Sequence, residues 1–176
     1  MRADADPKRI LDLLAALGRE ATGPGSLYLT GGATAVLHGW RSTTLDVDLS
    51  FSPEPPGVFA ALGRLKDLLD LNIELASPAH FIPELPGWRD RSIFIERHGR
   101  LDCFHYDLYS QALSKVERGH PRDRLDVAAM LSHGLVERGR LRALFDSVVP
   151  SFERFPAIDP DEFRAKLEEA LGVPAQ

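Results

Sequence analysis

Residues 26–51 read SLYLTGGATAVLHGWRSTTLDVDLSF, and this stretch decides the fold class. Residues 26–30 predict a short strand, and the glycine pair after them leads into small and apolar residues that predict a helix. Residues 44–51 then alternate strictly between polar and apolar side chains, which is typical of a strand with one buried face. The stretch therefore predicts two strands connected through a glycine turn and a helix.

The rest of the chain adds further strands before its middle and helices after it. Alternation predicts a strand at 71–76, and a hairpin is expected from 92–96 and 101–106. Helices are expected at 6–20, 58–70, 107–118, 122–133, 141–148 and 161–171. This order predicts an α+β fold with its helices gathered to one side. We expect one domain over 1–145 and a helical extension over 146–176 that packs on the same domain.

The composition is that of an ordinary globular protein. Of the 176 residues, 44% are hydrophobic and 27% are charged, so the chain can bury a core. No run of about 18 apolar residues predicts a membrane span, and the polar start does not resemble a signal peptide. The single cysteine, Cys103, excludes an internal disulfide, and no Cys/His spacing suits zinc. We therefore expect a cytoplasmic protein with no membrane partner.

The net charge of −5 argues against a general nucleic-acid binder. The charge is unevenly spread, however, because residues 86–145 carry 11 basic and 8 acidic side chains. Most of these basic residues are arginines, whose forked donors suit phosphate. Two interpretations stay open, namely a solvated surface of ion pairs or a patch that faces the phosphates of a nucleotide or an RNA.

Asp46 and Asp48 lie two residues apart on the predicted strand 44–51, so their side chains project from the same face. Two carboxylates this close repel each other unless a cation lies between them, most simply a hard divalent ion with oxygen ligands. Glu74, on the polar side of strand 71–76, is a candidate third ligand if the two strands are neighbours. Three carboxylates can hold two Mg²⁺ ions about 3.5–4 Å apart for in-line displacement at phosphorus. The alternative is that these residues are merely solvated.

Gly31 and Gly32 occupy the turn between the first predicted strand and its helix. Bare backbone N–H groups at such a turn, together with a helix N-terminus, favour an anion. Arg41 and Thr44 come just before the aspartates and are candidates for phosphate contacts. A glycine pair alone is more often only a tight turn. The sequence lacks both the Walker loop and the G-x-G-x-x-G fingerprint, which excludes the two commonest phosphate-binding folds.

The nucleotidyltransferase (polymerase-beta-like) superfamily has a signature that this chain resembles in three ordered motifs, Thr30-Gly31-Gly32, Arg41-Ser42-Thr43-Thr44 and Asp46-Val47-Asp48. Within it, the chain is most similar to minimal bacterial nucleotidyltransferases related to AbiEii-type toxins. In that group a later segment reads Lys, Arg-Gly, Arg/Lys-Asp and Asp, which here corresponds to Lys115, Arg118-Gly119, Arg122-Asp123 and Asp126. The resemblance covers about Tyr28 to Leu131. It implies a mixed β-sheet with flanking helices, so the expected fold class is α+β, nucleotidyltransferase-like, with a helical C-terminal part.

The resemblance also implies roles for individual residues. Asp46 and Asp48 match the metal ligands, with Glu74 as a third for which Asp102 or Asp107 could substitute. The phosphate-binding set that it implies is Thr30, Gly31, Gly32, Arg41, Thr44 and Lys115. The expected catalytic set is Asp46, Asp48, Lys115, Asp123 and Asp126. In it, Asp123 or Asp126 orients Lys115 or helps to deprotonate the acceptor.

The leading hypothesis is a Mg²⁺-dependent nucleotidyltransferase that moves an NMP from an NTP, for instance ATP, to a hydroxyl of a protein or an RNA such as a tRNA. Two Mg²⁺ ions are expected. The resemblance suggests a toxin–antitoxin or phage-defence setting with a cognate toxin or antitoxin as partner. A non-catalytic antitoxin or partner-binding module of the same fold and a metal-dependent phosphohydrolase are the alternatives. His38 and His105 are interpreted as satisfied or surface histidines rather than general bases.

Overall fold

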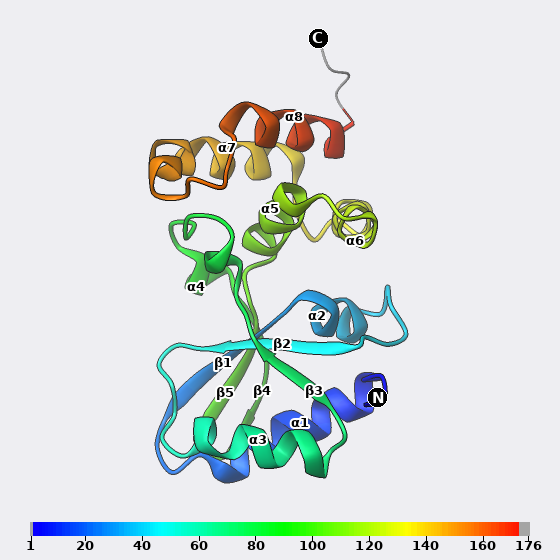
Figure 1. Cartoon of the computed structure of the whole chain (residues 1–176), viewed down its shortest axis with the longest axis vertical. Coiled ribbons are helices and arrows are strands. Elements are labelled where there is room, and N and C mark those ends of the chain that lie inside the picture. The colour runs from blue at the N-terminus through cyan, green and yellow to red at the C-terminus, as the bar shows by residue number, and fades with distance from the viewer. Residues whose placement is uncertain (1, 173–176) are drawn as a thin grey trace. The chain divides into compact units, whose positions relative to one another are not determined.

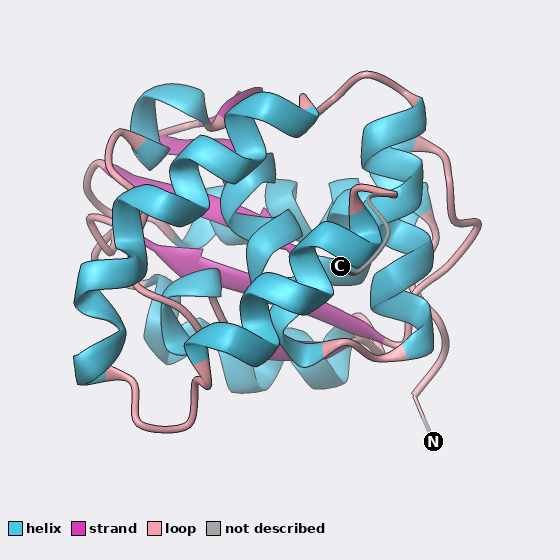
Figure 2. Cartoon of the chain, turned by 90° about the horizontal axis from the view of Figure 1, so that it is seen from above, coloured by secondary structure: helices cyan, strands magenta, loops and turns pink. Residues whose placement is uncertain are grey.

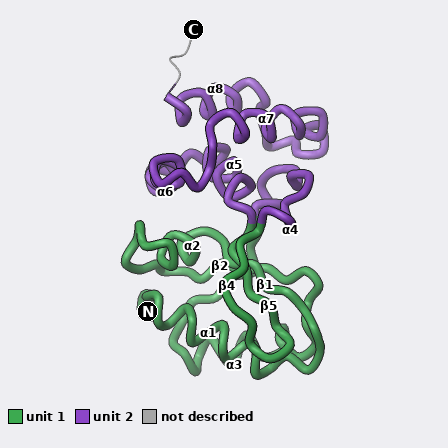
Figure 3. The backbone as a smooth tube through the Cα atoms, turned by 180° about the vertical axis from the view of Figure 1, so that it is seen from behind, with its two compact units in different colours: residues 1–77, 92–106 green, residues 78–91, 107–176 purple. Residues whose placement is uncertain are grey.

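The structure is a computed structural model that describes residues 2–172. The chain divides into two compact units, coloured separately in Figure 3. Unit 1 consists of Met1–Ser77 and Ser92–Tyr106, and unit 2 consists of Pro78–Arg91 and Asp107–Gln176. The division falls at 77/78, 91/92 and 106/107, and the domain boundary expected at 145/146 stays a prediction.

Unit 1 contains a five-stranded sheet and three helices (Figure 1). The strands have the order β3-β2-β1-β5-β4. Their bounds are β1 Gly25–Thr30, β2 Asp46–Phe51, β3 Asn72–Leu75, β4 Ile93–His98 and β5 Leu101–His105. The helices are α1 Pro7–Glu20, α2 Gly31–His38 and α3 Val58–Leu68.

The sheet is mixed, as expected. β1 pairs antiparallel with β2 and parallel with β5, β2 pairs parallel with β3, and β4 pairs antiparallel with β5. The adjacency of β2 and β3 brings the polar faces of the two alternating segments side by side. The predicted hairpin is confirmed as β4 and β5.

One face of the sheet carries the core of unit 1. Val47 and Leu49 of β2 are fully buried, and they share their cluster with Leu27 and Leu29 of β1 and with apolar side chains of α1 and α3. The N-terminus of α1 is capped by Asp6, whose side chain accepts a hydrogen bond from the backbone N–H of Arg9. Because side chains alternate along a strand, burial of one face of β2 leaves Asp46 and Asp48 on the other.

Unit 2 is helical. Figure 2 shows the helices of the whole chain in cyan and its strands in magenta. Its helices are α4 Trp88–Arg91, α5 Leu108–Arg118, α6 Pro121–Ser132, α7 Arg138–Val148 and α8 Pro160–Ala170, with 3₁₀ turns η1 Pro78–His80 and η2 Val149–Arg154. Phe145, Phe152 and Phe163 form an aromatic cluster at its core, with centroids 4.9–5.7 Å apart. The helical C-terminal part is thereby confirmed, while α4 and the two 3₁₀ turns lie where only loops were expected.

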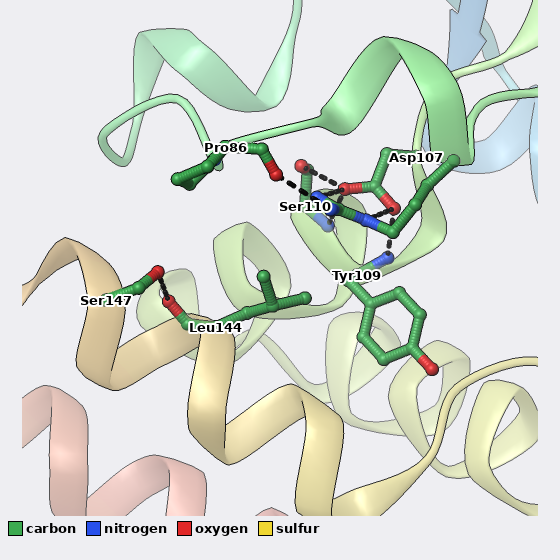
Figure 4. Close-up of polar contacts among 7 residues, drawn as sticks. Pro86, Asp107, Tyr109, Ser110, Leu144 and Ser147 are labelled. Carbon is green, nitrogen blue, oxygen red and sulfur yellow. Dashed lines mark hydrogen bonds and ion pairs between the residues drawn. The ribbon is translucent and has the colours of Figure 1, made fainter.

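The start of α5 is fixed by a buried ion pair within unit 2. Asp107 caps the helix and accepts hydrogen bonds from the Ser110 hydroxyl and from the backbone N–H groups of Tyr109 and Ser110 (Figure 4). Arg91 donates to both oxygens of the same carboxylate, from Nε at 3.1 Å and from Nη2 at 2.8 Å. This bidentate pair ties the segment 78–91 to α5, which explains why that segment belongs to unit 2 rather than to the sheet.

Candidate functional site

The turn between β1 and α2 is built around Gly31. This residue has φ +61°, in the left-handed region that favours glycine. A β carbon placed on it would lie 2.5 Å from Oδ2 of Asp48. Thr30, which precedes the turn, is the ladder partner of Asp48. The Asp48 carboxylate therefore lies directly against the glycine turn.

Gly32 is equally confined, but by side chains. A β carbon there would overlap Oγ1 of Thr44 and would lie 3.4 Å from Nη1 of Arg41. The Thr44 hydroxyl donates to the backbone carbonyl of Asp46 at 3.1 Å. Thr44 also forms an isolated bridge with Ala5, so β2 begins at Asp46 rather than at residue 44. The segment 41–44 thus packs against the second glycine of the turn and leads directly into the two aspartates.

The polar faces of β2 and β3 form one acidic surface, defined by Asp46, Asp48, Asn72 and Glu74. In the parallel ladder Asp46 is opposite Asn72, and Asp48 is opposite Glu74. The Asn72 amide Nδ2 donates to Oδ1 of Asp46 in a short hydrogen bond and to Oε1 of Glu74 at 3.5 Å. Glu74 was a candidate ligand only if its strand is next to the strand of the aspartates, and β3 does pair with β2.

The carboxylates of the acidic surface are oxygen ligands of the kind that Mg²⁺ prefers, but they do not form a complete coordination site. Among residues 2–172, no three Asp, Glu, His or Cys side chains converge on a point that a metal ion could occupy. Mg²⁺ is usually held by one or two carboxylates together with substrate phosphates, and the Asp48 carboxylate against the Gly31 turn offers that combination. The residues present therefore fit an ion that arrives with a nucleotide, and Glu74 as third ligand stays a prediction.

The two alternatives to Glu74 are both engaged by arginine. Asp102 forms a two-point ion pair with Arg97, whose Nη2 lies 3.0 Å from Oδ2. Asp107 is 1% exposed and holds the bidentate pair with Arg91. A carboxylate that already neutralises a guanidinium is a poor cation ligand. Glu74, which is exposed and forms no ion pair with a basic side chain in the described part of the chain, is thus the strongest of the three candidates.

A buried polar contact pins the other side of the glycine turn. Oγ1 of Thr34, in the first turns of α2, lies 3.3 Å from the Leu29 carbonyl and 3.1 Å from Nδ1 of His105 at the end of β5. Burial, with a smaller effect from His38, lowers the pKa of His105 from 6.5 to about 3. His105 is therefore neutral and links α2 to β5. The hydrogen bond between Thr34 and Leu29 joins the residues on either side of the turn, and His105 contacts the same hydroxyl. No sequence motif had indicated these contacts of Thr34 and His105.

Unit 2 contains the remaining predicted residues in one buried ion-pair cluster. Nζ of Lys115, a side chain that is 4% exposed, lies 2.6 Å from Oδ2 of Asp126 and 3.4 Å from Oδ1 of Asp123. Arg118 also reaches Oδ1 of Asp123, at 2.8 Å, and stacks over the ring of Phe81. Oδ2 of Asp123 is buried and has no hydrogen-bond partner among the described residues. Lys115 is therefore not a solvated helix lysine.

The predicted residues thus fall into two groups. Unit 1 brings together the glycine turn, the segment 41–44 and the acidic surface, and unit 2 brings together Lys115, Asp123 and Asp126. Sequence reasoning placed Asn72 on the polar face of its strand but gave it no role. Its signal was the strand alternation, which becomes informative only when the partner strand is known.

Comparison with known proteins identifies the family of this chain. A family model described as "Nucleotidyltransferase of unknown function (DUF6036)" matches residues 7–166, which is most of both units. No curated protein and no solved structure matches the chain. The family match supports the nucleotidyltransferase part of the resemblance and does not bear on the relation to AbiEii-type toxins. No helix within residues 2–172 is long and apolar enough to cross a membrane. The chain belongs to the DUF6036 family of nucleotidyltransferases of unknown function.

Proposed function

We propose that the protein is a Mg²⁺-dependent nucleotidyltransferase that transfers an NMP from an NTP to a hydroxyl of a protein or an RNA. The observation that carries this proposal is the contact between Gly31 and Asp48. A phosphate-binding turn and a cation-binding carboxylate are useful together only when they are adjacent, and a β carbon at Gly31 would lie 2.5 Å from that carboxylate.

Each predicted site residue of unit 1 has a proposed part in binding the triphosphate. Backbone N–H groups at the start of α2 face an anion favourably, since a helix N-terminus carries about half a positive charge. Arg41 and Thr44, which pack against Gly32, are the side chains that we expect to orient phosphate oxygens. Asp46 and Asp48 would hold Mg²⁺, which when bound supplies positive charge that neutralises the triphosphate. Two ions stay the expectation, with Glu74 as the additional ligand.

The transfer itself requires one bond to form and one to break. The acceptor oxygen attacks the α-phosphorus in line, and the bond from that phosphorus to the oxygen of the leaving pyrophosphate breaks. The acceptor's proton passes to a carboxylate or to water. Positioning and electrostatic stabilisation account for most catalysis in such reactions, so the role of the protein is to hold the NTP and the acceptor in line.

For unit 2, Lys115 remains the expected NTP-facing lysine. Of the two roles predicted for Asp123 and Asp126, orientation of Lys115 is supported by their ion pairs with Nζ at 3.4 and 2.6 Å. The acceptor, the choice of ATP among NTPs and a toxin–antitoxin or phage-defence setting rest on the resemblance alone.

Calorimetry with Mg²⁺ and a non-hydrolysable ATP analogue tests the binding part of the proposal. The double variant Asp46→Asn, Asp48→Asn should abolish Mg²⁺-dependent binding while it keeps the fold, and Ser50→Ala, on the same face of β2, is the matched control. Unchanged nucleotide affinity in the double variant would overturn the metal assignment.

The catalytic part is tested with NTPs labelled at the α-phosphate, Mg²⁺ and cell extract. A labelled protein or RNA band supports nucleotidyl transfer. Release of NMP without a labelled acceptor would instead indicate a phosphohydrolase. Tight NTP binding with neither product would indicate a non-catalytic module of this fold.

A further inference from the structure

Asn72 is the only asparagine in the 176-residue chain, and it lies between two of the carboxylates of the acidic surface. It is the first residue of β3 and the ladder partner of Asp46. Its Nδ2 donates to Oδ1 of Asp46 and approaches Oε1 of Glu74 at 3.5 Å. Ionised carboxylates only accept hydrogen bonds, so the end of the amide that faces them has to be the NH₂ group. The orientation of the amide is therefore dictated by its neighbours.

This amide is the principal polar partner of the Asp46 side chain. Neither Asp46 nor Glu74 forms an ion pair with Lys, Arg or His in the part of the chain that the structure describes. Oδ2 of Asp46 accepts no hydrogen bond from any residue that the structure describes. One oxygen of Asp46 is thus held by Asn72, and the other remains available to a ligand from outside the chain.

We propose that Asn72 is a positioning residue for the cation that the acidic surface binds. By holding Oδ1 it fixes the rotation of the Asp46 carboxylate so that Oδ2 is presented to the ion, and its second contact keeps Glu74 beside the same group. Hydrogen bonds of this kind orient ligating carboxylates, and their loss typically costs 10–100-fold in metal affinity. This inference rests on the proposed function, because it concerns the same Mg²⁺ site.

The first test measures affinity for Mn²⁺, as a spectroscopic substitute for Mg²⁺, together with the non-hydrolysable ATP analogue. Asn72→Ala should weaken Mn²⁺ binding about 10–100-fold, and Ser50→Ala should leave it unchanged. Affinity within twofold of wild type in Asn72→Ala, while Asp46→Asn loses binding, would overturn the role of Asn72 and leave the proposed function standing. If neither Asp46→Asn nor Asn72→Ala changes affinity, the proposed function fails as well.

The second test observes the amide directly. Because the chain has one asparagine, protein labelled with ¹⁵N at the asparagine side chain yields a single NH₂ pair in the NMR spectrum. We expect one of its two protons to be shifted downfield by the Asp46 carboxylate, to move toward the shift of a free amide in Asp46→Asn, and to stay downfield when Mg²⁺ and the analogue bind. A free-amide shift in the wild type, or a shift that Asp46→Asn does not change, would overturn the proposal even if Asn72→Ala weakens binding.

Discussion

Gly31→Ala should damage both stability and nucleotide binding, and the structure supplies its own control for the comparison. Gly31 and Gly39 are both in the left-handed region, at φ +61° and +90°. A β carbon at Gly39 would have no heavy atom within 4 Å, whereas one at Gly31 would lie 2.5 Å from Oδ2 of Asp48. Gly39→Ala therefore measures the cost of the backbone conformation alone, and the excess cost of Gly31→Ala measures the contact with the carboxylate.

The two costs can be worked out separately. An alanine in the left-handed region costs about 1–2 kcal/mol. At Gly31 the carboxylate has also to move by about 1 Å to reach ordinary contact, which forces Asp48 out of its rotamer for about 0.5–1.5 kcal/mol more. We expect Gly39→Ala to lower the free energy of unfolding by about 1–2 kcal/mol and Gly31→Ala by about 1.5–3.5 kcal/mol. Mg²⁺–nucleotide affinity should fall at least about tenfold in Gly31→Ala alone, because a small displacement of a charged group is costly.

Urea denaturation and calorimetry with the non-hydrolysable ATP analogue measure these quantities. In an Asp48→Ala background the clash is absent, so Gly31→Ala should then cost no more than Gly39→Ala. Equal losses of stability for Gly31→Ala and Gly39→Ala in the wild-type background, together with wild-type nucleotide affinity, would refute the reasoning. That result would mean that the turn tolerates a β carbon and that Asp48 is not held against it.

Three further predictions concern the groups that support the site. Thr34→Val should lower the free energy of unfolding by about 1–3 kcal/mol and weaken nucleotide binding, whereas Thr34→Ser, which keeps the hydroxyl, should restore both; equal effects of the two would contradict the pinning role. Because the pKa of His105 is about 3 when folded and 6.5 ordinarily, the unfolded chain binds the extra proton between these values. Stability should therefore fall as pH drops from 6.5 toward 3, by at most about 1.4 kcal/mol per pH unit from this group, and His105→Gln should remove that part of the slope in urea titrations at several pH values. Lys115→Met should cost about 3–5 kcal/mol, because it removes the buried ammonium that pairs with Asp126 and Asp123, and adding Asp126→Leu should recover part of the loss in thermal melts; a double variant as unstable as the single one would argue against the pair.

The local parts of the fold could be predicted because they depend on neighbours in sequence. Strict alternation identified β2, and its burial left Asp46 and Asp48 on the other face as expected. The glycine pair at 31 and 32 marked the turn into α2. Both signals lie within a few consecutive residues, where the spacing of apolar side chains and the presence of glycine predict local structure.

The parts that could not be predicted depend on pairing between distant segments. The ladder sets Asn72 opposite Asp46; alternation puts Asn72 on the polar face of its strand, but no local pattern shows which strand it pairs with or which residue it faces. His105 meets Thr34 because β5 runs beside β1, and Arg91 pairs with Asp107, a residue 16 positions later in the chain. Contacts of this kind exist only after the chain has folded.

The same distinction explains why the acidic surface has no preformed three-ligand site. Alternation guarantees that Asp46 and Asp48 share a face, and register guarantees that Glu74 is next to Asp48, but neither makes three side chains converge on one point. The amide of Asn72 donates hydrogen bonds to the carboxylates of Asp46 and Glu74 and so moderates the repulsion between these two groups. A surface of this kind should bind Mg²⁺ weakly alone and much more tightly with a triphosphate, since the phosphate oxygens complete the coordination that the protein leaves open. Binding of the ion and of the nucleotide would then be coupled, which is what an enzyme that acts on a metal–NTP complex requires.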